Sequence, residues 1–164
     1  MDPTAWLNGN VPGFRELQAA ECEAISHFTF LWSLFESKCL NRQANNQAIE
    51  KLVNAWASDN ILDTSFFIEP LHYFRHRYFL TDPPQGRFSS LKVAENKREL
   101  VEKVLRGEDN DPVRCTTALL FVVYRLRNNL FHGEKWVYDL RDQKDNFGEA
   151  NKTLIGALEI AGRR

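Results

Sequence analysis

The sequence predicts an all-α protein, a single bundle of about five to seven helices in which neighbours run up and down. Apolar residues recur at spacings of three, four and seven along most of the chain, whereas the alternating polarity of strands is scarce. The chain has only 8 glycines and 6 prolines, which argues against an all-β protein rich in tight turns. Its 164 residues, 43% of them hydrophobic, are enough for one domain with a real core.

A polar, turn-rich leader is predicted for residues 1–13, and one helical domain for residues 14–164. Pro12 and Gly13 close the leader, and a long helical pattern then continues to about Leu40. The apolar face of this first helix is formed by Leu17, Ala24, Phe28, Leu31 and Phe35.

Two further helical segments are predicted before the middle of the chain, at residues 46–57 and 61–80. Residues 58–60 supply the turn between them. Pro70 must start, bend or break the later segment, because proline has no amide donor. Residues 82–90 contain two prolines and a glycine, and they are predicted to form a loop. The apolar positions that define the two segments are Ile49, Val53, Trp56, Phe67, Leu71, Phe74 and Tyr78.

Three more helices are predicted in the rest of the chain. The first, at residues 93–106, is charged and amphipathic and ends at Gly107. The next has Pro112 in its first turn and runs to His132. The last begins near Glu149 and carries Leu154, Leu158 and Ala161 on its apolar side.

Charge and cysteine content exclude several classes of protein. The formal net charge is -1, so a contact with nucleic acid would need a local basic patch and not a globally basic domain. The three cysteines, Cys22, Cys39 and Cys115, lack paired spacing and predict buried thiols, with neither a disulfide framework nor a zinc site. We expect no cofactor and no metal. The absence of a signal-like start and of a long apolar run predicts a cytoplasmic protein.

The helix that begins at Pro112 has two contrasting faces on a helical wheel. One face is a tight apolar stripe that predicts the core: Leu119, Val123, Leu126 and Leu130. The opposite face combines aromatic and polar residues: Phe121, Tyr124, Asn128 and His132, with Arg125 beside them. Exposed aromatic side chains would cost roughly 1.5 kcal/mol or more each. Either another helix of the bundle or a second copy of the protein must therefore cover them.

The end of this helix resembles the signature of the HEPN superfamily. In that signature an arginine is followed directly by a polar residue, and four to six residues separate the arginine from a histidine further along. Arg127, Asn128 and His132 match it with four intervening residues, and Arg125 also falls within the permitted spacing but is followed by leucine. Residues 30–36 (FLWSLFE) are similar to the Leu-Trp-x-x-Phe-Glu pattern of many bacterial HEPN domains.

The resemblance implies a metal-independent endoribonuclease, in which the 2′-hydroxyl of RNA is the nucleophile. His132 would transfer protons, because histidine titrates near neutral pH. Arg127 would stabilise the scissile phosphate with its planar, permanently charged guanidinium group. Asn128 would orient the histidine, donate to a phosphate oxygen, or be purely structural.

The resemblance also implies partners. Two motifs would meet across a homodimer cleft, which favours a second copy as the cover for Phe121 and Tyr124. RNA would be the substrate, and an antitoxin protein would restrain the enzyme if it belongs to a toxin–antitoxin or defence system. Two alternatives remain open: a non-catalytic HEPN module that binds RNA, nucleotide or protein, and a helical dimerisation or scaffold protein.

Several residues are further candidates for RNA contact or support of the motif. Glu36 lies at the inner edge of the first helix, where it either pairs with Arg125 or Arg127 or is solvated. Basic and aromatic residues interleave in residues 72–78, either to bind RNA or as an amphipathic helix with its charges in water. The candidate RNA-binding residues are Tyr124, Arg125, Arg75, His76 and Arg77.

Overall fold

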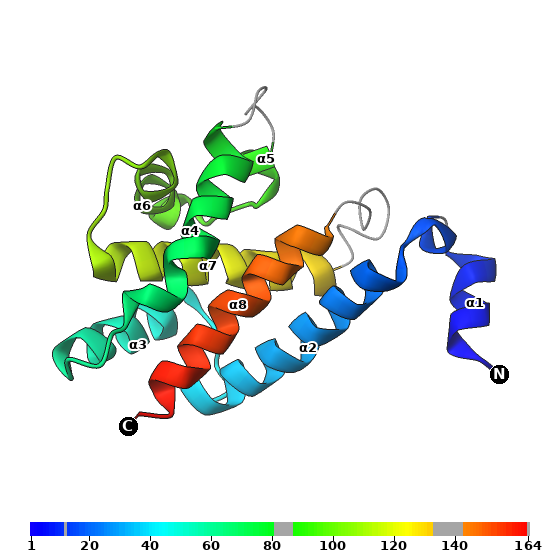
Figure 1. The fold of residues 1–164 in the computed structure, drawn as a ribbon, viewed down its shortest axis with the longest axis horizontal. Coiled ribbons are helices and arrows are strands. Elements are labelled where there is room, and N and C mark those ends of the chain that lie inside the picture. Colours follow the sequence, from blue (N-terminus) through cyan, green and yellow to red (C-terminus); the bar gives the residue numbers. More distant parts are fainter. Residues whose placement is uncertain (12, 81–86, 133–142, 164) are drawn as a thin grey trace.

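The computed structural model describes residues 1–11, 13–80, 87–132 and 143–163. Within these ranges the chain is all-helical, with eight α-helices and no strand (Figure 1). The prediction of a single all-α domain is therefore confirmed. The number of helices exceeds the prediction because two short ones, α1 (Pro3–Asn10) and α5 (Arg87–Ser90), lie where a leader and a loop were expected.

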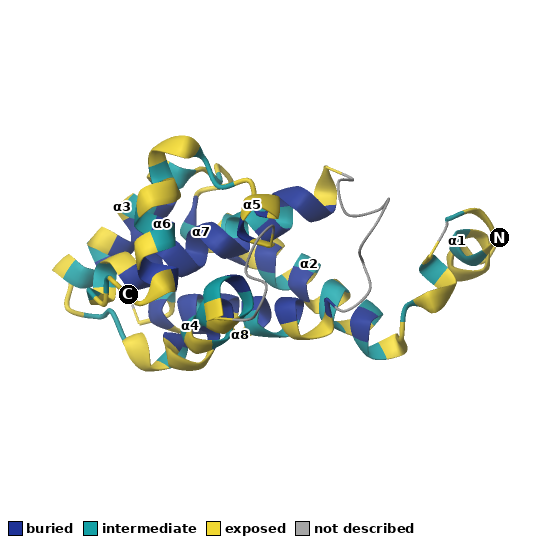
Figure 2. Cartoon of the chain, turned by 90° about the horizontal axis from the view of Figure 1, so that it is seen from above, coloured by how far each residue is buried: buried dark blue, intermediate teal, exposed yellow. Residues whose placement is uncertain are grey.

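The leader contains a helix that takes no part in the core. Asp2 caps α1 by accepting a hydrogen bond from the Thr4 amide at 3.0 Å, and Pro3 suits the first turn. None of the residues of α1 is buried, and the helix stands apart from the bundle in Figures 1 and 2. A short 3-10 turn, η1 (Phe14–Glu16), connects it to the domain.

Two long helices from opposite ends of the chain, α2 (Ala19–Cys39) and α8 (Lys144–Ala161), lie side by side and run in the same direction (Figure 1). The Phe28 and Phe147 rings pack at 5.0 Å, and the Asn151 side chain donates to the Ala24 carbonyl at 3.0 Å. The up-and-down arrangement that we predicted for neighbours is wrong for this pair. No short loop joins these helices, so nothing forces them to be antiparallel.

The central helix is α7 (Pro112–Phe131), which is dark blue along most of its length in Figure 2 because it is buried on several sides. The predicted core stripe is confirmed, since Leu119, Val123, Leu126 and Leu130 are all buried. The helix begins as predicted at Pro112, with Asp111 accepting from the Arg114 amide at 2.9 Å.

The remaining elements pack against α7 or against a helix that contacts it. They are α3 (Asn46–Ser58), η2 (Thr64–Phe67), α4 (Ile68–Arg75), the π-helical turn η3 (His76–Leu80) and α6 (Glu95–Arg106). Pro70 lies in the first turn of α4, where its missing amide breaks no helical hydrogen bond. Gly107 ends α6 in the left-handed conformation, as predicted, with φ of 78°.

The largest errors of the sequence prediction are at helix starts. Leu17 and Gln18 have extended backbones, so α2 begins at Ala19 and not directly after the leader. The final helix begins at Lys144, five residues before the predicted Glu149. None of the helices in the described ranges is long and apolar enough to cross a membrane.

Candidate functional site

Arg127 lies where α7 crosses α2, in a group of side chains that we call the Arg127 cluster: Trp32, Glu36, Arg127 and Asn128. The Trp32 indole donates to Glu36 Oε2 at 2.7 Å, and the same oxygen lies 3.8 Å from Arg127 Nη2. The prediction that Glu36 pairs with Arg125 or Arg127 is thus decided in favour of Arg127. Helical spacing explains the cluster, because Trp32 and Glu36 are one turn apart on the same face of α2.

Two aromatic rings lie close to the guanidinium group of Arg127. Its central carbon lies 5.9 Å from the centre of the Trp32 ring and 5.3 Å from that of Phe131. Both distances fall within the range of cation–π attraction. The Arg127 side chain is 29% exposed, so part of it reaches solvent.

Asn128 is buried and turned toward the arginine. Its side-chain oxygen accepts a hydrogen bond from Arg127 Nη1 at 3.0 Å. Asn128 thus orients the arginine, a role that we did not predict for it, since the predicted roles were to orient the histidine, to donate to a phosphate oxygen or to be purely structural. Arg127 Nε is buried and has no hydrogen-bond partner among the described residues. Because Nε is buried, the donors that a phosphate could reach belong to the two Nη groups, of which Nη1 already donates to Asn128.

His132 is the residue immediately after α7, and its side chain is exposed. Its amide donates to the Asn128 carbonyl at 2.9 Å, as the last turn requires. Within the described ranges its side chain makes no hydrogen bond or ion pair. Arg127 and His132 lie about 140° apart around the helix and about 7.5 Å apart along it. The histidine is thus near the Arg127 cluster but not in contact with it.

Two residues of this site were not predicted as part of it: Trp32 and Phe131. Phe131 is 52% exposed and lies between Arg127 and His132 at the end of α7. Its signal in the sequence is the spacing of four residues from Arg127, which places an aromatic ring over a long cationic side chain on one helix face.

The aromatic face of α7 is covered within the chain. Phe121 is 1% exposed, Tyr124 stacks on Trp32 at 5.8 Å, and the Tyr124 hydroxyl donates to the Ala44 carbonyl at 3.1 Å. Of the two covers that we considered, another helix of the bundle is the one found. The argument for a homodimer from exposed aromatic residues on this face was therefore wrong. The homodimer itself stays a prediction.

Arg125 occupies a separate, structural position. Its Nε donates to the Leu91 carbonyl at 2.9 Å and its Nη2 to Asn129 at 3.4 Å. Asn129 in turn donates to the Ser90 carbonyl at 3.1 Å, so the two side chains fasten the end of α5 to α7. This arrangement leaves Arg127 as the arginine beside Glu36 and Asn128.

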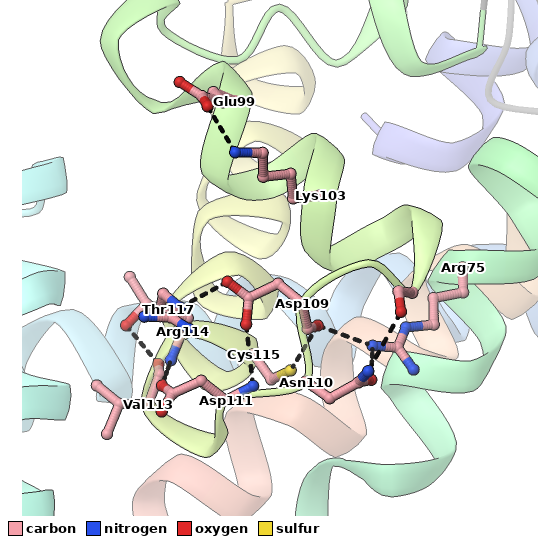
Figure 3. Close-up of polar contacts among 11 residues, drawn as sticks. Arg75, Glu99, Lys103, Asp109, Asn110, Asp111, Val113, Arg114, Cys115 and Thr117 are labelled. Atoms are coloured by element: carbon pink, nitrogen blue, oxygen red, sulfur yellow. Dashed lines mark hydrogen bonds and ion pairs between the residues drawn. The ribbon is translucent and has the colours of Figure 1, made fainter.

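Arg75 also binds backbone within the chain. It donates to the carbonyls of Val104 and Asp109, at 2.9 and 3.3 Å, and to the Asn110 side chain at 2.8 Å (Figure 3). These bonds fasten α4 to the turn between α6 and α7, which makes Arg75 a poor contact for RNA.

The other basic candidates on this segment have different environments. Arg77 donates to the Tyr73 hydroxyl at 3.2 Å, and His76 is exposed. Both lie in η3, whereas the Arg127 cluster lies at the crossing of α2 and α7. The structure therefore gives no common site for the two groups of basic residues.

The thiols and the possible metal ligands offer no second reactive centre in the described part of the chain. Burial raises the pKa of the Cys39 thiol to about 11, and burial also raises the pKa of Cys115. Both thiols are therefore protonated at neutral pH. The described residues contain no group of three or more histidine, cysteine, aspartate and glutamate side chains arranged to hold a metal ion.

Comparisons with protein families, with curated proteins and with solved structures found no match to this chain.

Proposed function

We propose that the chain is a metal-independent endoribonuclease of the HEPN type, with Arg127 and His132 as its working residues. The observation that carries the proposal is the environment of Arg127: its guanidinium group lies near two aromatic rings, contacts Glu36 and Asn128, and is partly exposed to solvent. A pre-oriented guanidinium group of this kind suits the binding of a phosphate oxygen.

The reaction needs one proton to leave the 2′-hydroxyl and another to reach the departing 5′-oxygen. The 2′-oxygen attacks phosphorus while the bond from phosphorus to the 5′-oxygen breaks, which gives a 2′,3′-cyclic phosphate and a 5′-hydroxyl. His132 is exposed and within one and a half turns of Arg127, so it can serve one of these proton transfers. Arg127 stabilises the charge that develops on the phosphate.

A homodimer that joins two copies of the motif remains part of the proposal. Phe121, Tyr124 and Asn128 are covered inside the chain, so such an interface would have to use the end of α7, where Phe131 and His132 are exposed. We also propose that the enzyme belongs to a toxin–antitoxin or defence system, because its near-neutral net charge suits an enzyme that a partner protein restrains.

The test is incubation of the purified protein with labelled single-stranded RNA in EDTA. We expect wild type to produce 2′,3′-cyclic phosphate ends, and His132→Ala and Arg127→Ala to lose about a hundredfold or more of that activity. His27→Ala and Arg98→Ala are matched controls. Both residues are exposed away from the Arg127 cluster, and neither substitution should change cleavage.

Equal cleavage by wild type and His132→Ala would show contamination or another site, and it would overturn the assignment. Folded wild type that cleaves none of several RNAs would overturn the ribonuclease and favour the non-catalytic module. Binding of RNA that depends on Arg127 would then identify the same surface as a binding site.

A further inference from the structure

Helix α2 presents two large apolar side chains to solvent. Phe30 is 74% exposed and Leu34 is 43% exposed, although both lie within a long helix whose other face is in the core. Ile155 on the neighbouring α8 is 46% exposed. Adjacent exposed apolar residues on an ordered helix indicate a surface that another protein covers.

The two residues belong to a longer line along α2, which we call the α2 stripe. Its members are all exposed and lie within about 80° of one another around the helix: Glu23, His27, Phe30, Leu34 and Lys38. An acidic residue therefore lies at one end, a basic residue at the other, and the apolar pair between them.

This order is self-complementary. If two copies of α2 lie antiparallel and are aligned at the midpoint between residues 30 and 31, Glu23 of one copy faces Lys38 of the other, and His27 faces Leu34. Among the described residues, the contact of Glu23 is with His27 at 4.0 Å, which is an ion pair only when the histidine is protonated. Lys38 makes no ion pair within the described ranges. Both charges are thus available to a partner.

We propose that the α2 stripe binds the same stripe of a second copy of this chain, antiparallel and around a twofold axis. The two Phe30 rings meet at the axis, and Leu34 of each copy covers His27 of the other. Glu23 of each copy pairs with Lys38 of the other, about 11 Å from the axis at either end. A twofold contact of this kind uses the same surface patch on both copies.

The surface beside the stripe gives the second copy more to contact. Leu34 and Lys38 line a groove of about 630 Å³, which is completed on α8 by Leu158, Glu159, Ala161, Gly162 and Arg163. In this dimer His27 of the second copy lies opposite Leu34, so the N-terminal end of the second copy's α2 would enter this groove. The stripe contributes five side chains from each copy, far fewer than the roughly 20 of a standard interface, so we expect a reversible dimer with a dissociation constant in the micromolar range.

This interface is distinct from the one that the proposed ribonuclease would need. Glu36, which marks the Arg127 cluster on α2, lies about 120° round the helix from Phe30 and about 160° from Leu34. A dimer through the stripe therefore leaves both clusters open to solvent. The inference does not rest on the proposed function, and its test requires no RNA.

The test is exchange of the charges, with mass measured by sedimentation over a range of concentrations. Wild type should dimerise reversibly, and Glu23→Lys or Lys38→Glu should weaken the dimer about tenfold or more. The double variant should recover the dimer, and a mixture of the two single variants should form heterodimers. Phe30→Glu should weaken the dimer about a hundredfold. Lys51→Glu, an equal charge change at an exposed residue of α3, should have no effect.

Wild type that remains monomeric at its highest soluble concentration would overturn the proposal. So would a dimer that Phe30→Glu leaves intact, or single charge reversals that the double variant does not rescue. Because every substituted side chain is exposed, circular dichroism of each variant should match wild type, and folding does not confuse the result.

Discussion

At the scale of single residues, the environment of Arg127 balances two effects. Glu36 and Asn128 orient the guanidinium group, but the charge of Glu36 also offsets part of its attraction for a phosphate. The ion pair is partly exposed, with side chains 29% and 23% accessible, so it adds little to stability. The main effect of this ion pair is to fix the position of the Arg127 side chain.

Replacement of Glu36 by glutamine separates the two effects. Glutamine keeps an oxygen to accept the Trp32 indole hydrogen bond, whereas the negative charge near Arg127 is lost. We expect single-stranded RNA to bind about fivefold tighter at low salt, since about 1 kcal/mol of opposing charge is removed, and the gain should shrink at high salt. Fluorescence anisotropy measures the change.

Glu95→Gln on α6 is the control, because it removes an equal charge far along the chain from the cluster. If Glu36→Gln and Glu95→Gln bind RNA with the affinity of wild type, Arg127 does not contact the phosphate.

At the scale of helices and turns, the turn between α6 and α7 is built around Asp109. Its carboxylate accepts from Arg114 at 2.5 Å and from the Asp111 amide at 3.0 Å (Figure 3). The hydrogen bond from Arg114, followed by that from the Asp111 backbone, holds the pKa of Asp109 below its usual range. The turn in turn positions the start of α7, the helix that carries the candidate site.

Asp109→Asn should lower the melting temperature at neutral pH, and the difference from wild type should narrow as the pH falls. A carboxylate whose pKa is lowered in the folded state stabilises the fold at pH values above its unfolded pKa of about 3.9. This stabilisation is lost as the pH falls through the lower pKa of the folded state. Calorimetry from pH 7 to pH 3, with Glu108→Gln as the exposed neighbour, measures the effect. A difference that does not depend on pH would mean that the carboxylate charge is not involved.

Gly156 lies where α8 packs tightly against η2. A β-carbon placed there would lie 2.5 Å from the Phe66 β-carbon and 3.3 Å from Cε1 of the buried Phe67. Gly156→Ala should therefore destabilise the protein by about 1–3 kcal/mol, despite the better helix propensity of alanine.

Gly148→Ala is the matched control in the same helix, because no atom lies within 4 Å of the β-carbon it would introduce. We expect it to stabilise the protein by about 0.5–1 kcal/mol. Urea unfolding measures both variants, and equal effects at the two positions would contradict the close packing of α8 on η2.

The helices were predictable because their signals are local. Capping residues, Pro112, Gly107 and the apolar periodicity of α7 mark elements that the structure confirms. The cover of Phe121 was not predictable, because a helical wheel shows which face is apolar but not which helix packs on it. The pairing of Glu36 with Arg127 depends likewise on how α2 crosses α7, and the sequence offered it only as one alternative.

At the scale of the whole molecule, the core can do without the first helix. No residue of α1 is buried, and its contacts are with η1, including a hydrogen bond from Arg15 to the Asn8 carbonyl. Removal of residues 1–12 should therefore leave the midpoint of thermal unfolding unchanged within about 1 °C. A large drop would show that α1 packs on the domain in solution.

The parallel pair of α2 and α8 has a consequence for the order in which the protein can be made. The Ala24 carbonyl and the side chain that bonds to it are 127 residues apart in sequence. Until α8 has been synthesised, the face of α2 that carries Phe28 lacks this packing partner, and its apolar side chains remain exposed. The nascent chain therefore stays partly folded until its last helix is made, and in this state it is prone to aggregate or to bind chaperones. A chain that stops at residue 143 should keep this state, visible as binding of a dye that fluoresces on apolar surfaces.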